Sequence, residues 1–167
     1  MLDGDDALAD RWIARRAGPD DVETVRSISA EAYAASYLPV FGYLPAPAME
    51  DYGAHIAVGE VWFVEDPEPR RPVGVAVLER HASHLLVYNL AVLPERWGEG
   101  IGRRLLALAE ERARAVGHEE VRLFTNTRMT RNLSIYRRAG YRETGRRPHP
   151  FRAGVVLVDM SKRLEPI

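Results

Sequence analysis

Apolar and polar positions alternate along several segments of the chain, and this pattern predicts strands. Residues 11–17 alternate, and three further apolar runs lie at 61–66, 73–81 and 83–93. The last two runs lie close enough along the chain to form a hairpin. The run at 83–93 is apolar on both faces, which is typical of a strand at the centre of a sheet.

Helical spacing of apolar residues predicts helices at about 19–35, 46–58, 100–116 and 130–139. A proline followed by two acidic residues begins the first of these helices. Residues 36–45 contain two prolines and are expected to form a loop with apolar content. Gly117 and Gly140 lie where the last two helices should end.

Further strands are predicted at 121–125, from Tyr141 onward and at 151–164. The resulting order is one strand, two helices, three strands, a helix, a strand, a helix and two strands. This order indicates an α/β chain (α+β) with a mixed sheet. We expect a single domain over residues 11–164, preceded by a flexible acidic tail at 1–10.

The composition excludes several classes of function. The net charge is −1, so no general basic surface for nucleic acid or an anionic membrane is expected. Cysteine is absent, which excludes thiolate catalysis and cysteine-ligated zinc. No apolar run approaches the roughly 20 residues of a membrane span. The N-terminus has neither the basic start nor the apolar run of a signal peptide, so a cytoplasmic protein is expected.

Three glycines alternate with other residues between an apolar run and a helix. They are Gly98, Gly100 and Gly102 in LAVLPERWGEGIGRRLL, residues 90–106. A strand, a glycine turn and a helix N-terminus can form a phosphate site, because free amides and the helix dipole attract anions and glycine lets them approach. A turn that only reverses the chain is the alternative. A P-loop is excluded because the single lysine is Lys162, and the G-x-G-x-G spacing disfavours a dinucleotide fold.

A second motif lies one predicted strand later. The segment RNLSIYRRAGY (131–141) places Asn132 and Tyr136 four residues apart, on one face of a helix. Each residue alone would be more typical of a helix cap or of core packing. Together with residues 92–106, the segment resembles the GCN5-related N-acetyltransferase (GNAT) superfamily, whose motifs are Gln/Arg-x-x-Gly-x-Gly/Ala and Asn-x-x-x-Tyr followed by Gly-Phe or Gly-Tyr. The resemblance extends from about residue 10 to residue 164.

The resemblance implies a GNAT-like acyl-CoA N-acyltransferase fold with splayed central strands, and an enzyme that uses acetyl-CoA as a cosubstrate. Trp97 departs from the family, because the motif usually has Gln or Arg there, and it is expected to act through its backbone amide. The residues implied to contact the coenzyme are Leu90, Ala91, Val92, Trp97, Gly98, Glu99, Gly100, Ile101, Gly102, Arg103, Asn132 and Tyr136. Leu90 and Val92 should pair with the pantetheine arm, and the amides of residues 98–103 should hold the pyrophosphate. The Arg103 side chain is expected either to contact a phosphate or to be solvated.

The resemblance also implies that an amine attacks the thioester directly, through a tetrahedral intermediate. Tyr136 is implied as the general acid, because a phenol with a pKa of about 10 can protonate a leaving thiolate. The backbone N–H of Val92, or that of Leu90, is the expected oxyanion donor. Asn89 is the polar residue of an apolar strand, and it could orient a water or satisfy the backbone. A water-mediated route is the default for proton removal, with three candidate bases nearby: Glu79, His81 and His84.

Aromatic residues gather between positions 33 and 52. The resemblance implies that this segment shapes the acceptor site, and packing of the same rings on the sheet is the alternative. Tyr33 and Tyr37 are the candidate substrate residues here, and Thr125 and Asn126 are candidates for the opposite wall. A small-molecule amine is favoured as the acceptor.

The favoured function is therefore N-acetyl transfer from acetyl-CoA to a primary amine. The alternatives are a non-catalytic coenzyme A-binding sensor or regulatory module, and acetylation of a protein amine. Tyr136 favours catalysis, because a retired catalyst could have lost it. We expect no metal, no nucleic acid and no membrane partner, and we leave a homodimer open.

Overall fold

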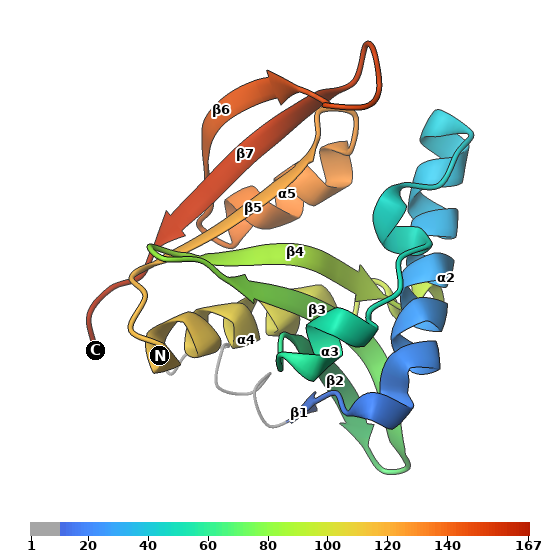
Figure 1. The fold of residues 1–167 in the computed structure, drawn as a ribbon, viewed down its shortest axis with the longest axis vertical. Coiled ribbons are helices and arrows are strands. Elements are labelled where there is room, and N and C mark those ends of the chain that lie inside the picture. The colour runs from blue at the N-terminus through green and yellow to red at the C-terminus, as the bar shows by residue number, and fades with distance from the viewer. Residues whose placement is uncertain (1–10) are drawn as a thin grey trace. The chain divides into compact units, whose positions relative to one another are not determined.

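Seven strands form a mixed sheet in the computed structural model, which describes residues 11–167 (Figure 1). The strands are β1 Ile13–Arg16, β2 Val61–Pro67, β3 Arg70–Arg80, β4 Leu85–Val92, β5 Glu120–Asn126, β6 Arg142–Pro148 and β7 Val156–Arg163. The helices are α2 Val22–Phe41, α3 Gly53–Ala57, α4 Ile101–Ala115 and α5 Thr130–Arg138, with 3-10 turns η1 Pro19–Asp21, η2 Ala46–Ala48 and η3 Pro94–Arg96. The order within the sheet is β1-β2-β3-β4-β5-β7-β6. The predicted α/β class and element order are confirmed.

The chain divides into two compact units that do not follow chain order. The first unit contains the described residues up to Leu78 together with Asn89–Leu108, and the second contains Glu79–Tyr88 and Ala109–Ile167. Both β4 and α4 contribute residues to each unit. The single domain over residues 11–164 stays a prediction, and the tail predicted at 1–10 lies outside the described residues.

In the first unit, β3 lies directly against the start of α4. A Cβ atom on Gly74 of β3 would lie 2.8 Å from Cγ2 of Ile101 and 3.0 Å from Cδ1 of Leu105. Both helix residues are buried. Because only glycine permits an approach this close, Gly74 fixes how near the first turns of α4 can lie to the sheet.

Helix α2 is longer than the sequence pattern predicted, since it continues to Phe41 instead of ending near Ala35. Pro39 lies inside its last turn, where the missing N–H removes a hydrogen bond close to the helix end. The helix ends at Gly42, which has φ 73° and donates its N–H to the carbonyl oxygen of Leu38. The glycine, not the proline, therefore sets the end of the helix.

The helix predicted at 46–58 is interrupted. The structure has the short turn η2 and, after a gap, the short helix α3. Within the gap, Oδ1 of Asp51 accepts the N–H of Gly53 at 2.9 Å. This local bond from a side chain to the backbone competes with continuous helical hydrogen bonding, which explains the break.

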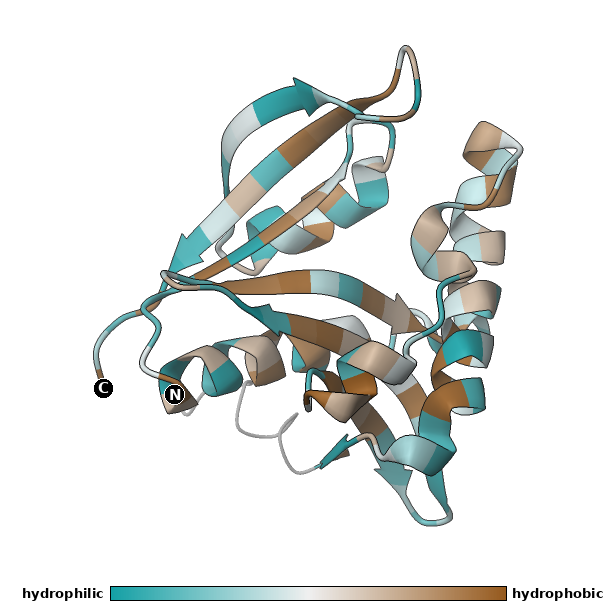
Figure 2. Cartoon of the chain, in the orientation of Figure 1, coloured by the Kyte–Doolittle hydropathy of each residue, from teal (hydrophilic) through white to brown (hydrophobic). Residues whose placement is uncertain are grey.

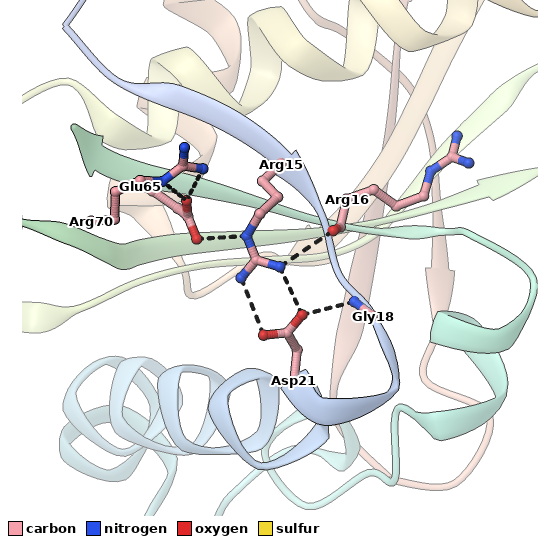
Figure 3. Close-up of polar contacts among 6 residues, drawn as sticks. All are labelled: Arg15, Arg16, Gly18, Asp21, Glu65 and Arg70. Atoms are coloured by element: carbon pink, nitrogen blue, oxygen red, sulfur yellow. Dashed lines mark hydrogen bonds and ion pairs between the residues drawn. The ribbon is translucent and has the colours of Figure 1, made fainter.

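A buried carboxylate anchors α2 to the sheet (Figure 3). Glu65 of β2 is 3% exposed and accepts hydrogen bonds from Nε of Arg15 at 2.7 Å and from Nη2 of Arg70 at 2.7 Å. The Arg15 guanidinium also binds the carboxylate of Asp21, which accepts the N–H of Gly18 at 2.7 Å. The hydrogen bond from Arg15 lowers the pKa of Asp21. Because Asp21 immediately precedes α2, this cluster ties the helix start to β1 and β2.

In the second unit, the start of β4 pairs in parallel with β5, through residues 85–87 against residues 121–123. Strand β5 also pairs in antiparallel register with β7, and β7 pairs in the same manner with β6. The side chains of Leu123, Val158 and Met160 are buried in this unit. Strand β6 is exposed or half-exposed at every residue, and Figure 2 shows it mostly in hydrophilic colours beside the more hydrophobic β7.

Candidate active site

The end of β4 directs part of its backbone away from β3. The N–H of Leu93 donates to the carbonyl oxygen of Val73 in β3 at 3.0 Å, and the carbonyl oxygen of Ala91 also lies toward β3. Backbone groups of successive strand residues point to opposite sides of the strand. The backbone groups of Leu90 and Val92 therefore face away from β3, as an added strand would require.

Trp97 forms a hydrogen bond with one of these backbone groups, the carbonyl oxygen of Val92. Its indole Nε1 donates to the carbonyl oxygen of Val92 at 2.9 Å, across the turn that leaves β4. The ring is half-buried. Trp97 therefore holds the turn against the strand with its side chain, a contact that the sequence motif did not reveal.

The glycine turn requires glycine at two of its three positions. Gly98 has φ 87° and Gly100 has φ 94°, in the left-handed region that other residues rarely adopt. Gly102 has an ordinary backbone conformation, and a Cβ atom there would meet only Cγ2 of Val92, at 4.0 Å. Backbone geometry thus explains why glycine stands at positions 98 and 100. It does not explain the glycine at position 102.

The first turn of α4 presents backbone amides. The first helical hydrogen bond runs from the N–H of Arg104 to the carbonyl oxygen of Gly100 at 3.0 Å. The amides of Ile101 and Gly102 precede that bond and have no acceptor within the helix. The helix dipole adds partial positive charge at the same point, so the turn has the chemistry of an anion site. The side chain of Arg103 is exposed beside it.

Ion pairs with arginine offset the charge of Glu99, the acidic residue within this turn. Nε of Arg96 donates to Glu99 at 2.6 Å, and its Nη1 and Nη2 donate to Asp66 at the end of β2 at 2.7 and 2.9 Å. Arg11 also donates to Glu99, at 3.3 Å. The hydrogen bonds from Arg96 lower the pKa of both carboxyl groups. Arg96 therefore pins the turn to β2, and it offsets a negative charge that would oppose a bound phosphate.

Asn89 is the centre of a buried polar network. Its Oδ1 accepts the hydroxyl of Tyr33 at 2.8 Å, and its Nδ2 donates to Oγ of Ser29 and to the hydroxyl of Tyr52, each at 3.0 Å. The Tyr52 hydroxyl donates onward to the carbonyl oxygen of Pro47. Asn89 is 1% exposed and Ser29 is fully buried. The network ties α2 and the segment before α3 to β4, and its partners lie 37 to 60 residues from Asn89 in the chain.

The candidate acceptor residues of the first unit lie in one row of rings. Tyr33 and Tyr37 contact each other edge to face, with ring centroids 5.7 Å apart. The row continues from Tyr37 to Phe41 at 4.8 Å and from Phe41 to Tyr43 at 5.6 Å. All four rings are half-buried. Burial raises the pKa of Tyr37, with a smaller contribution from Tyr43.

The second motif lies on α5, in the second unit. Asn132 is half-buried near the start of the helix. Tyr136 is 9% exposed, and its ring lies 6.3 Å from that of Tyr141. Within residues 11–167, the buried hydroxyl of Tyr141 has no hydrogen-bond partner, and burial raises its pKa.

Thr125 and Asn126 end β5, also in the second unit. Both are buried. Oδ1 of Asn126 accepts the N–H of Arg128 at 3.0 Å, and its carbonyl oxygen accepts the N–H of Met129 at 2.9 Å. Asn126 thus shapes the turn between β5 and α5. Its predicted role as a wall of the acceptor site stays a prediction, as does that of Thr125.

The candidate bases lie around the turn between β3 and β4. Glu79 and His81 approach each other at 3.2 Å, and the rings of His81 and His84 stack with centroids 4.8 Å apart. Burial lowers the pKa of His84, with a further contribution from Arg122. No three His, Cys, Asp or Glu side chains within residues 11–167 form a group that could hold a metal ion.

The predicted site residues thus fall into two groups. The first unit brings together the end of β4, the glycine turn, Asn89 and Tyr33, and the second unit holds Asn132, Tyr136 and the end of β5. Sequence reasoning missed Ser29, the bond between Tyr52 and Asn89, and the Arg96–Asp66 pair. The one available signal was Asn89 itself, a polar residue in an apolar strand.

A family comparison matches the middle of the chain. The family model of the acetyltransferase (GNAT) domain matches residues 57–143, which include β4, the glycine turn and α5. That is more than half of the 167 residues. The chain belongs to the GNAT acetyltransferase family. The resemblance drawn from the two motifs is confirmed.

Two curated relatives of this GNAT chain are acetyltransferases. It is 30% identical over 132 residues to mycothiol acetyltransferase of Clavibacter sepedonicus, covering 74% of this chain and 40% of that protein. It is 41% identical over 58 residues to aminoalkylphosphonate N-acetyltransferase of Salmonella typhimurium, covering 35% of this chain and 38% of that protein. The chain therefore spans about two fifths of the length of each of these relatives.

Solved structures share the GNAT fold at lower identity. PaiA N-acetyltransferase of Thermoplasma acidophilum, in complex with coenzyme A, is 18% identical, with a TM-score of 0.73 over 91% of this chain and 98% of that one. The ribosomal-protein-S18-alanine N-acetyltransferase of Escherichia coli is 14% identical, with a TM-score of 0.72 over 93% and 96% of the two chains. At these identities the likeness concerns the fold. Separately, none of the helices in residues 11–167 is both long and apolar enough to cross a membrane.

Proposed function

We propose that this protein transfers the acetyl group of acetyl-CoA to a primary amine, and that the acceptor is a small molecule. The observation that carries the proposal is the junction of β4 and α4. A strand end with backbone groups facing away from its neighbour leads, through two left-handed glycines, into a helix N-terminus. This combination suits a ligand with an amide-bearing arm and a pyrophosphate.

Different residues of the first unit are assigned to different parts of the cosubstrate. The N–H and C=O of Leu90 are assigned to the arm, since the Val92 carbonyl oxygen already accepts a hydrogen bond from Trp97. The amides of Ile101 and Gly102 are assigned to the pyrophosphate. Acetyl-CoA supplies a thioester whose carbonyl carbon an amine can attack. We assign the N–H of Val92 to the oxyanion that forms there, because a fixed backbone donor lowers the barrier of such a step.

The residues of α5 complete the proposal by their match to the family motif. Asn132 is assigned to the arm, and its half-buried position in the first turn of α5 supports that role. Tyr136 is assigned as the acid that protonates the leaving thiolate. Proton removal from the amine is assigned to water. Asn89 keeps a second lone pair on Oδ1 beyond the bond from Tyr33, and this lone pair could orient that water.

The cradle is tested with Gly102→Ala. Alanine is favoured over glycine within a helix, so this variant should be as stable as the wild type or more so. Its Cβ would nevertheless stand where the phosphate approaches, and losing a charge-assisted hydrogen bond should raise KM for acetyl-CoA about tenfold or more. Thiol release measured against acetyl-CoA concentration gives KM. Gly145→Ala in β6, where a Cβ would meet no atom within 4 Å, is the matched control. An unchanged KM in Gly102→Ala would contradict the cradle.

The acid is tested with Tyr136→Phe against Tyr141→Phe. The first variant should lower kcat about 10- to 100-fold with little change in acetyl-CoA binding. The second removes a buried hydroxyl without a described partner, and it should leave kcat unchanged. Equal kcat in all three proteins would remove Tyr136 as the acid. Binding of acetyl-CoA without thiol release for any amine in a broad panel would favour the non-catalytic module.

A further inference from the structure

One face of α2 carries aromatic rings that begin at the site. Tyr33, Tyr37 and Phe41 are spaced four residues apart, which places them along one side of the helix. Tyr43, just after the helix, closes the row, with its ring 6.5 Å from Tyr37 and 5.6 Å from Phe41. We call these four residues the aromatic row. They form one continuous series of ring contacts within the first unit.

The aromatic row starts next to the strand to which the cosubstrate is assigned. The Tyr33 hydroxyl donates to Oδ1 of Asn89 at 2.8 Å, and Asn89 directly precedes Leu90 in β4. With a rise of about 1.5 Å per residue, Tyr37 lies about 6 Å and Phe41 about 12 Å along the helix from Tyr33. The row therefore leads away from the assigned acetyl position over the length of a small amine.

The rings of the aromatic row do not belong to the closed core of the unit. All four are half-buried, whereas the core aromatic residues Phe63 and Tyr52 are fully buried. Exposed apolar side chains lie in the same part of the chain, with Leu38 44% and Met49 64% exposed. Apolar surface that stays accessible in this manner is typical of a binding site.

The charge of this region favours a cation. Residues 22–60 contain five acidic residues, and Arg26 is the single Arg or Lys there. Glu50 and Glu60 bind His55 and Glu23 pairs with Arg26, so the attraction comes chiefly from Glu31 and Asp51. A primary amine is protonated near neutral pH, so this segment attracts it before it loses its proton. Tyrosine and phenylalanine faces also bind ammonium groups directly.

We infer that the acceptor is an arylalkylamine, a primary amine that carries an aromatic ring two to four carbon atoms away, with its ring seated on the aromatic row. The inference rests on the proposed function, because it assigns the acceptor side of the same site. Tyr37, Phe41 and Tyr43 set the specificity by ring contacts, and Tyr33 marks the end at which the amine reacts.

Binding tests the inference without relying on turnover. Calorimetric titrations of the wild type, with and without coenzyme A, compare 2-phenylethylamine with n-butylamine and with 3-phenylpropionate. 2-Phenylethylamine has both the ring and the cation. n-Butylamine lacks the ring, and 3-phenylpropionate lacks the cation. We expect 2-phenylethylamine to bind at least about tenfold more tightly than either of the others. Equal affinity for n-butylamine, tighter binding of the acid, or no measurable binding of 2-phenylethylamine overturns the inference.

Variants then locate the ring. Phe41→Leu and Tyr37→Leu keep an apolar side chain but remove the ring, so each should weaken 2-phenylethylamine about 5- to 20-fold and n-butylamine less than about twofold. Tyr37→Phe keeps the ring and should keep the preference. Phe151→Leu, at a ring that is 90% exposed in the second unit, is the matched control and should change neither affinity. A loss in Tyr37→Phe as large as that in Tyr37→Leu, or no loss in either leucine variant, overturns the assignment.

Thiol release in the same panel separates the two proposals. Turnover of n-butylamine at the same kcat/KM as 2-phenylethylamine would overturn the arylalkylamine inference and leave the acetyltransferase proposal intact. Tight binding of 2-phenylethylamine without thiol release from any amine would do the reverse.

Discussion

Two ion pairs, one in each compact unit, differ in burial although their distances are nearly equal. In the first unit, Arg15 donates to Glu65 at 2.7 Å, and the Glu65 side chain is 4% exposed. In the second unit, Arg146 donates to Glu143 at 2.6 Å, but the two side chains are 54% and 31% exposed. A charge removed from water costs free energy if its partner is lost, whereas an exposed pair is screened and contributes little. Burial, not distance, therefore decides how much each of these two pairs contributes to stability.

Charge differs between the units as strongly as burial does. Residues 22–60 of the first unit contain five acidic residues and one arginine, while residues 128–152 of the second contain eight arginines and one glutamate. The net charge of −1 for the whole chain averages these opposite regions. A near-zero net charge excludes a general basic surface, but it does not describe either region.

The largest expected effect comes from Asn89→Ala in the first unit. The substitution removes three hydrogen bonds and leaves buried hydroxyl groups on Ser29 and Tyr52 without that partner. We expect the free energy of unfolding to fall by about 3 kcal/mol, because unsatisfied buried polar groups carry their full desolvation cost. Urea denaturation followed by circular dichroism measures the change.

Glu143→Gln is the counterpart of Asn89→Ala in the second unit. Its carboxylate is exposed and pairs at the surface, so the denaturation midpoint should stay unchanged within error. An equal loss of stability in the two variants would break the contrast between the units.

A smaller effect is expected from a methyl group added at a close contact. Gly74→Ala places a Cβ atom against Ile101 and Leu105, where α4 approaches β3, and should cost about 1–3 kcal/mol by overpacking. Gly145→Ala in β6 meets open space and should cost nothing measurable. Thermal denaturation of both variants tests this pair. A Gly74→Ala protein with wild-type stability would show that α4 can move away from the sheet freely.

The smallest effect concerns two histidines whose pKa values shift in opposite directions. In the first unit, burial lowers the pKa of His55, but hydrogen bonds to Glu60 at 2.7 Å and Glu50 at 3.2 Å outweigh burial and raise it overall. Its contribution to stability is therefore full below the unfolded pKa of about 6.5 and is lost as pH rises through the folded pKa. In the second unit, burial lowers the pKa of His84, so its contribution is full at high pH and is lost as pH falls below about 6.5.

Denaturation midpoints measured between pH 5 and 9 test this opposition, in His55→Gln and His84→Gln beside the wild type. Relative to the wild type, His55→Gln should gain stability as pH rises, and His84→Gln should gain stability as pH falls. Parallel pH profiles for the two variants would contradict it.

The sequence predicted the backbone features of the site better than its side-chain contacts. The glycine turn, the end of β4 and the start of α4 follow from local patterns, because turn and helix signals act over a few residues. Asn89 was visible as a polar residue in an apolar strand. Its partners were not, because the hydrogen bonds from Ser29, Tyr33 and Tyr52 depend on how distant segments pack.

Local signals also misled where two of them competed. Pro39 predicted an early end for α2, although a proline in the last turn removes only one hydrogen bond and Gly42 provides the actual cap. The pattern likewise joined η2 and α3 into one helix, because it gave no weight to the bond between the Asp51 side chain and the Gly53 backbone.

The bond between Trp97 and Val92 also bears on solubility. An open strand edge is a template on which a second protein chain can pair, and proteins restrict such edges to avoid aggregation. The indole takes up one lone pair of the Val92 carbonyl oxygen and lies beside the end of β4. A foreign strand that extends past Val92 meets the indole, whereas a short amide-bearing ligand can bind Leu90 and the Val92 N–H without reaching it. The Trp97 side chain thus allows a small ligand to bind at this strand edge and disfavours pairing with another copy of the chain.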